Sequence, residues 1–166
     1  MKLIPMRASV CALVLALASA TATAQADRLA ADVDAQIARH YGSVEALYKH
    51  LHANPELAFE EVNTAKRLAG ELRELGFEVT EGIGKTGVVG MLRNGQGPMV
   101  MVRTELDALP MEEKTGLPYA SKVKTTYQGK ESFVAHSCGH DLHMAAWVGT
   151  AKALVGLKDR WQGTLM

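Results

Sequence analysis

Three stretches of the 166-residue chain carry apolar residues every three or four positions, which is the spacing of an amphipathic helix. The first begins at Ser43, a residue suited to cap a helix. Its apolar face comprises Val44, Leu47, Tyr48 and Leu51. The second runs from Glu60 to Leu75, and the third starts at Asp141, as a cap, and extends to residue 157. We predict a helix in each stretch, preceded by a loosely packed, alanine-rich helix over residues 27–42.

The segment between the second and third helices carries patterns typical of strands. An edge strand is predicted over residues 77–80, and two further strands over residues 87–93 and 98–103. Asn94-Gly-Gln-Gly97 joins the latter two, which predicts a hairpin. The strand at 98–103 is almost wholly apolar, as in a strand that is covered on both faces.

The remaining patterns predict the fold class. Residues 111–135 are polar and irregular, which is typical of surface loops or the walls of a site. A further strand begins at Trp161. Helices and strands therefore alternate, and the length allows one domain at most, so we predict an α/β fold with a mixed central sheet flanked by helices.

The first 26 residues resemble a secretory signal peptide. Lys2 and Arg7 form a positive start, an apolar run follows over residues 8–20, and small residues then recur at the spacing of a cleavage site. The run is too short for a permanent membrane span. We therefore predict a signal peptide at 1–26, a mature chain at 27–166, and a secreted or periplasmic protein that does not bind membranes once the signal is removed.

The charge and cysteine content of the mature chain narrow its function. Loss of Lys2 and Arg7 leaves 16 basic residues against 18 acidic ones, a net charge of −2, which gives no indication of nucleic-acid binding. Cys138 becomes the one remaining cysteine and has no disulfide partner. In an oxidising compartment a lone exposed thiol is a liability, and coordination to a metal would protect it.

The candidate chemistry is concentrated in His136-Ser-Cys-Gly-His-Asp-Leu-His143, which holds three of the six histidines. Cys138 and His140 are two residues apart, so in a loop both side chains can reach one metal ion. Glu105 and Asp107 follow the apolar strand, and open α/β sheets place ligand sites at that end of a central strand. Simpler alternatives remain for each feature. The octapeptide could be a polar loop, the two acids could lie in a surface turn, and Cys138 could be a buried, inert thiol. His50 and His52 are more typical of surface or capping histidines.

Three motifs resemble one family. They are residues 52–61 (His-Ala-Asn-Pro-Glu-Leu-Ala-Phe-Glu-Glu), residues 103–110 (Arg-Thr-Glu-Leu-Asp-Ala-Leu-Pro) and the octapeptide at 136–143. In order and spacing they are similar to metal-dependent amidohydrolases of the aminoacylase and carboxypeptidase family. The branch is that of hippurate hydrolase and the auxin-conjugate hydrolases. The resemblance runs from about residue 43 to the end.

The resemblance implies a zinc-exopeptidase-like catalytic domain with two divalent metal ions, zinc or manganese, that cleaves N-acyl or N-aroyl amino acids. Cys138 and His140 are implied as metal ligands, and Asp107 as the catalytic aspartate. A soft thiolate with an imidazole suits zinc, and carboxylates extend the tolerance to manganese. His136 and His143 match the motif, and we expect them to support the ligands. The resemblance also allows a homodimer of the full-length protein.

Two features limit what the resemblance implies. Glu105 stands where the family usually has aspartate, while Ser137 and Leu142 replace the usual alanine and glycine. The family's general base, its remaining ligands and its small dimerisation domain lie beyond residue 166. We therefore expect these residues to be the N-terminal part of a catalytic domain and to be inactive alone. A non-catalytic metal- or substrate-binding protein and a hydrolase with a Cys138 nucleophile remain as alternatives.

Overall fold

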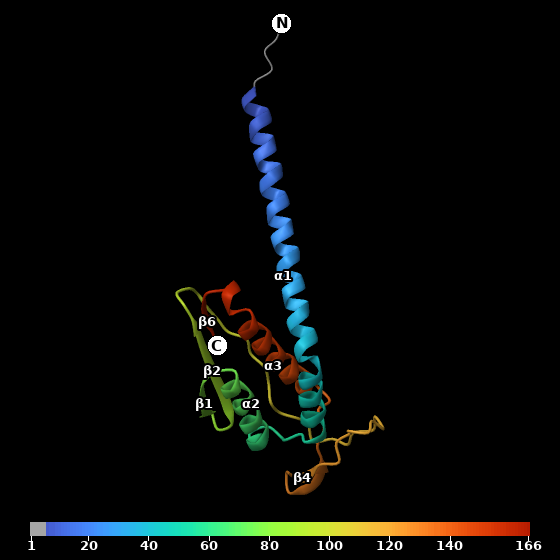
Figure 1. The fold of residues 1–166 in the computed structure, drawn as a ribbon. Coiled ribbons are helices and arrows are strands. Elements are labelled where there is room, and N and C mark those ends of the chain that lie inside the picture. The colour runs from blue at the N-terminus through green and yellow to red at the C-terminus, as the bar shows by residue number, and fades with distance from the viewer. Residues whose placement is uncertain (1–5) are drawn as a thin grey trace.

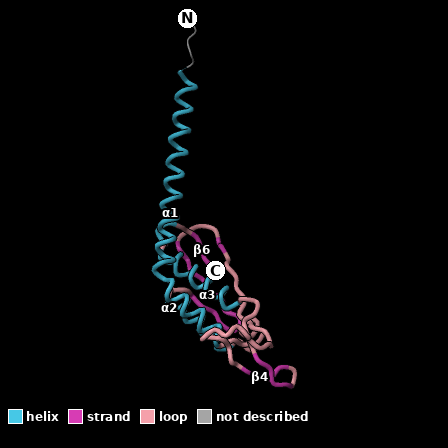
Figure 2. The backbone as a smooth tube through the Cα atoms, turned by 90° about the vertical axis from the view of Figure 1, so that its right-hand side faces the viewer, coloured by secondary structure: helices cyan, strands magenta, loops and turns pink. Residues whose placement is uncertain are grey.

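The structure is a computed structural model that describes residues 6–166, with side chains from Gln25 onward. Its elements are α1 (Met6–Ala53), α2 (Val62–Glu74), β1 (Glu78–Ile83), β2 (Gly87–Asn94), β3 (Met99–Val100), β4 (Lys124–Tyr127), β5 (Lys130–Phe133), α3 (His140–Gly156), the 3-10 helix η1 (Lys158–Arg160) and β6 (Gly163–Leu165). α1 packs against α3 and extends past the rest of the molecule at its N-terminal end (Figure 1). Most loops lie on the side opposite α1 (Figure 2). The predicted α/β class with a mixed sheet is confirmed.

α1 is one continuous helix, which differs from the two separate helices predicted around Ser43. The predicted cap at Ser43 is wrong, because its hydroxyl donates to the carbonyl of His40 one turn earlier, inside the helix. The predicted signal peptide lies partly outside the described residues. The structure does not describe residues 1–5, and it describes only the backbone of residues 6–24. In the described part of the chain, no helix combines the length and apolar character needed to cross a membrane.

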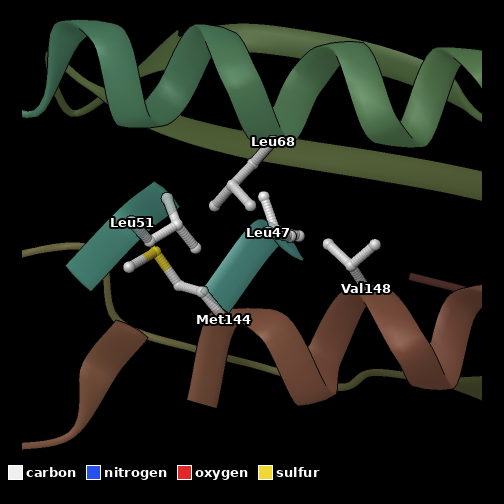
Figure 3. Close-up of a cluster of buried hydrophobic side chains, with 5 residues drawn as sticks. All are labelled: Leu47, Leu51, Leu68, Met144 and Val148. Carbon is white, nitrogen blue, oxygen red and sulfur yellow. The ribbon is translucent and has the colours of Figure 1, made fainter. Parts of the chain in front are cut away.

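The apolar stripes of the three helices meet in one cluster (Figure 3). It comprises Leu47 and Leu51 of α1, Leu68 of α2, and Met144 and Val148 of α3. All five side chains are at most 2% exposed. Burying one leucine of this kind contributes about 1.5–3 kcal/mol, so this cluster fixes how α1 and α3 lie against each other.

A second cluster joins the helices to the sheet. It comprises Leu72, Phe77, Leu92, Ala151 and Leu165. Because these residues come from α2, α3, β2, β6 and the residue before β1, α2 and α3 cover the same face of the sheet.

The sheet has the order β1-β2-β6-β3, with β6 antiparallel to β2 and parallel to β3. The predicted hairpin between β2 and β3 is therefore wrong, since β6 lies between them. The connection passes close to the residues before β6: a Cβ atom on Gly97 would lie 2.8 Å from the carbonyl oxygen of Gln162. Glycine at position 97 thus allows a close backbone approach that a two-strand hairpin would not require.

β3 is a short edge strand of the described sheet, although a central strand covered on both faces was predicted. Its neighbours continue in extended form, and the Val102 amide donates to the carbonyl of Met166. Met99, Val100 and Met101 are 58%, 56% and 64% exposed. The apolar character of this segment is therefore not matched by burial in this structure.

Residues 111–135 are more regular than predicted, because β4 and β5 form an antiparallel hairpin. Gln128 and Gly129 at its turn have φ angles of 51° and 77°, the positive values that a tight two-residue hairpin loop needs. In Figure 1 this hairpin lies at the end of the molecule away from the N-terminus.

The start of α2 is capped from the preceding loop. The Glu56 carboxylate accepts hydrogen bonds from the backbone amides of Asn63 (3.1 Å) and Thr64 (2.8 Å). Glu61, at the N-cap position, makes no such bond; it is buried and accepts from the Thr86 hydroxyl. Glu56 therefore satisfies two amides that the helix itself leaves without partners.

We predict that Glu56→Ala lowers the free energy of unfolding by about 1–2 kcal/mol, because it removes this cap. Glu56→Gln, which keeps one amide oxygen, should lose less. Glu60→Ala is the matched control, since Glu60 is exposed and its hydrogen bonds, to Leu57 and Val62, are made by its backbone. Urea denaturation of the three variants measures the effect, and equal losses in Glu56→Ala and Glu60→Ala would contradict it.

Candidate metal and catalytic site

The segment that carries Asp107 is held on two sides by backbone contacts. The amide of Ala108 donates to the carbonyl of Glu56 at 2.8 Å, and Leu109 exchanges hydrogen bonds with Ala135. These contacts join the loop before α2 and the strand-like residues before the octapeptide to one extended segment. Asp107 is therefore placed beside the start of α3 by two neighbours that are distant in sequence.

His140, the first residue of α3, is oriented by Asp107. Its Nδ1 atom lies 2.8 Å from the Asp107 carbonyl oxygen and 3.3 Å from a carboxylate oxygen of the same residue. A carbonyl oxygen can only accept, so Nδ1 carries a proton, and in the neutral imidazole Nε2 then has the lone pair. This arrangement is the one that orients histidine ligands of metals in proteins.

Cys138 lies two residues before His140, on the loop that enters α3. The thiol is exposed and forms no disulfide among the described residues. Gly139 between them has a φ angle of 79°, a left-handed conformation that glycine adopts without strain. The loop therefore turns sharply between the two candidate donors.

The donor chemistry of Cys138 and His140 fits a zinc-like ion. A thiol that can ionise and an imidazole with a free Nε2 are the ligand types that zinc takes in proteins. Within the described residues, no cluster of three or more histidine, cysteine or carboxylate side chains could hold a metal ion. The two residues would thus supply part of a coordination sphere, and their roles as ligands stay predictions, as does the catalytic role of Asp107.

A second carboxylate–imidazole pair lies next to the first. Glu105 and Asp107 are two residues apart on the extended segment, and His143 and His140 are three apart on α3. Nδ1 of His143 lies 3.2 Å from one carboxylate oxygen of Glu105. The other carboxylate oxygen lies 3.3 Å from the guanidinium of Arg103. The longer glutamate side chain at position 105 therefore reaches α3 and pairs with a half-exposed histidine.

His52 is buried between two carboxylates, so its interpretation as a surface or capping histidine is wrong. Its Nδ1 lies 2.6 Å from Asp141 and its Nε2 lies 2.9 Å from Glu113. The side chains of His52, Glu113 and Asp141 are 10%, 6% and 3% exposed. The predicted cap at Asp141 is also wrong, since its carboxylate faces His52 and makes no capping bond to α3.

Opposing effects set the protonation of this buried group. Burial lowers the pKa of His52, but the hydrogen bonds and charges of Glu113 and Asp141 outweigh it and raise the pKa above its usual 6.5. Burial likewise raises the pKa of Glu113, while hydrogen bonds from Thr115, His52 and the Ser121 amide lower it below its usual range. Both shifts favour an imidazolium between carboxylates.

His136 is buried at the centre of this region. Neither ring nitrogen has a hydrogen-bond partner among the described residues. Burial is the largest effect on it and lowers its pKa below 6.5. His140 and His52 add to that effect by repulsion, while the Asp141 and Asp107 carboxylates oppose it. The neutral imidazole is therefore favoured.

Two residues of this region were missed by sequence reasoning. For His52 a signal existed, because it lies four residues after Tyr48 and so continues the apolar stripe of α1, whereas His50 lies off that stripe and is exposed. For Glu113 no local signal exists: it lies in a polar loop, and its partner His52 is 61 residues away.

We predict that His52→Gln lowers the free energy of unfolding by about 3–5 kcal/mol, because it leaves two buried carboxylates without a cation. A histidine whose folded pKa is raised contributes fully below its unfolded value and loses that contribution as pH rises through the folded value. The difference between wild type and variant should therefore be larger near pH 6 than near pH 9. Urea denaturation at both values measures it, and a difference independent of pH would contradict the charged pair.

Sequence comparisons agree with these motifs. Residues 101–166 match the model of Peptidase family M20/M25/M40. The chain is 46% identical to a hippurate hydrolase of Campylobacter jejuni over 114 residues, 68% of this chain and 28% of that protein. It is 36% identical to an IAA-amino acid hydrolase of Arabidopsis thaliana, over 71% of this chain and 25% of the relative. The chain thus spans about a quarter of the length of these relatives.

Structural comparisons point the same way. A Bacillus subtilis protein described as a dinuclear metal-binding peptidase of the M20 family superposes with a TM-score of 0.67 at 35% identity, over 76% of this chain and 34% of that one. A putative aminohydrolase of Staphylococcus aureus gives 0.70 at 32% identity, over 81% and 33%. With the matched motifs, these similarities show that the chain belongs to the M20 peptidase family of hydrolases.

Proposed function

We propose that this chain is the N-terminal part of an exported, two-metal amidohydrolase that cleaves N-acyl or N-aroyl amino acids. The observation that carries the proposal is the orientation of His140 by the Asp107 carbonyl, two residues after an exposed Cys138. The hippurate hydrolase and IAA-amino acid hydrolase among the relatives support the substrate class. The neighbour described as dinuclear supports two metal ions.

The residues of this chain would hold and orient the site. Cys138 would bind as thiolate and His140 through Nε2, a donor pair that suits zinc, with manganese as an alternative. Divalent ions bound here supply electrophilic activation of the amide carbonyl and of the attacking water. Asp107 keeps the proton on Nδ1 of His140, so that Nε2 stays available as a donor.

The reaction also needs a proton carrier. Water adds to the amide carbon, the carbon–nitrogen bond breaks, and a proton moves to the leaving nitrogen, which yields a carboxylate and a free amino acid. Asp107 is already committed to His140 in this structure. We propose that the proton carrier and further ligands come from sequence after residue 166, where a homodimer of the longer protein could also form.

We predict that the full-length protein hydrolyses N-benzoyl or N-acetyl amino acids, and that chelation abolishes turnover until Zn²⁺ or Mn²⁺ is restored. Cys138→Ser should lower the hydrolytic activity by more than the roughly 10–100-fold that is typical of losing a residue that only supports a metal ligand. Ser137→Ala, an exposed neighbour, should retain activity. The 166-residue chain should show no turnover, and hydrolysis by it would contradict the incomplete site.

The same assay separates the alternatives. Inhibition by thiol alkylation together with insensitivity to chelators would favour a Cys138 nucleophile. Metal binding through Cys138 without turnover by the full-length protein would favour a non-catalytic binding protein.

Export is a separate part of the proposal. We predict that the protein recovered from the periplasm or medium begins near Asp27, because small residues precede that position at cleavage spacing. N-terminal sequencing or intact mass measures this. Recovery of the uncleaved chain from the cytoplasm alone would contradict export.

A further inference from the structure

α3 begins without the side-chain cap that usually starts a helix. Its N-cap residue is Gly139, which has no side chain, and the structure records no capping hydrogen bond there. Asp141 in the first turn is 2% exposed, and its carboxylate bonds to His52 of α1. The position of this helix start is therefore determined by α1 as well as by α3 itself.

His52 connects the helix start to a third segment. Its Nε2 bonds to Glu113, whose other carboxylate oxygen accepts from the Ser121 amide and thereby closes the loop between them. The rings of Tyr48 and Tyr119 lie 5.6 and 5.3 Å from the His52 ring and shield it from water. One imidazole thus joins the end of α1, the start of α3 and the 113–121 loop in a buried place.

We propose that the bridge Asp141–His52–Glu113 positions the loop–helix junction at residues 138–141, so that Cys138 and His140 can bind the same metal ion. Asp141 is the next residue after His140 in a rigid helical turn, and it lies three residues after Cys138. A change at His52 is therefore transmitted to both donors although it touches neither. The inference rests on the proposed function, because it gives the bridge a role in metal binding.

A bridge with a purely structural role would behave differently. Removing it would weaken the fold as a whole and leave the intrinsic geometry of the junction unchanged in the molecules that stay folded. A positioning role requires a local change at residues 137–143 and a change in metal binding.

Hydrogen exchange measures the local part in the 166-residue chain. The His143 amide, which donates to the Gly139 carbonyl at 3.0 Å, closes the first turn of α3. In His52→Gln we expect its exchange rate to rise about tenfold or more beyond the rise seen in the α2 amides, which report the overall loss of stability, because the added opening is local. His50→Gln is the matched control, with an exposed imidazole two residues away on the same helix.

Metal binding measures the functional part in the full-length protein. The metal-free protein is titrated with Co²⁺, whose thiolate charge-transfer absorption reports coordination by Cys138. We expect His52→Gln to weaken Co²⁺ binding by roughly 10–100-fold and to reduce the thiolate band, with no change in His50→Gln. Glu113→Gln preserves the Asp141–His52 bond; if His52→Gln does not fold, this variant should show the same changes to a smaller degree.

The outcomes are distinct. Wild-type Co²⁺ binding with a thiolate band that both His52→Gln and Glu113→Gln leave unchanged overturns the positioning role and leaves the proposed function standing. Exchange at His143 that rises no more than exchange in α2 in the folded variants overturns it as well. If Co²⁺ gives no thiolate band in the wild-type protein, the proposed metal centre is contradicted, and the positioning role is contradicted with it.

Discussion

The packing of α1 against α3 is the interaction on which the rest of the molecule depends. Leu47 and Leu51 meet Met144 and Val148 in a cluster from which water is excluded. That contact brings together two helices whose interacting residues are 93 to 101 positions apart in sequence. Since His52 directly follows Leu51, the same packing buries an imidazole, and both of its ring nitrogens bond to carboxylates of other segments.

The candidate site is a consequence of this arrangement. The extended segment with Glu105 and Asp107 runs along the start of α3, and each acid pairs with one histidine of that helix. Backbone contacts from two distant loops hold this segment in place. The polar groups therefore lie on a framework set by backbone hydrogen bonds and apolar packing.

Local signals in the sequence were sufficient for the apolar faces of the helices, for the strand after Trp161 and for the position of the octapeptide where a loop enters a helix, because each depends on periodicity or close spacing. They failed where the structure depends on distant partners. The Asn94–Gly97 connection has the composition of a hairpin, yet β6 enters between its strands. The apolar stripe of α1 indicates that His52 is buried, but the carboxylates that bind it lie 61 and 89 residues away, so no local pattern could show that it lies between two acids. The Gln-Gly turn of the β4–β5 hairpin was a weaker signal than Asn-Gly would have been.

The apolar edge at β3 has a consequence for how this chain behaves in solution. Residues 98–102 contain no charged residue, and no strand pairs with their outer side in the described sheet. An extended, uncharged edge of this kind offers free backbone donors and acceptors to any other extended peptide, including another copy of the chain. An edge of this kind favours association between copies of the chain at high concentration.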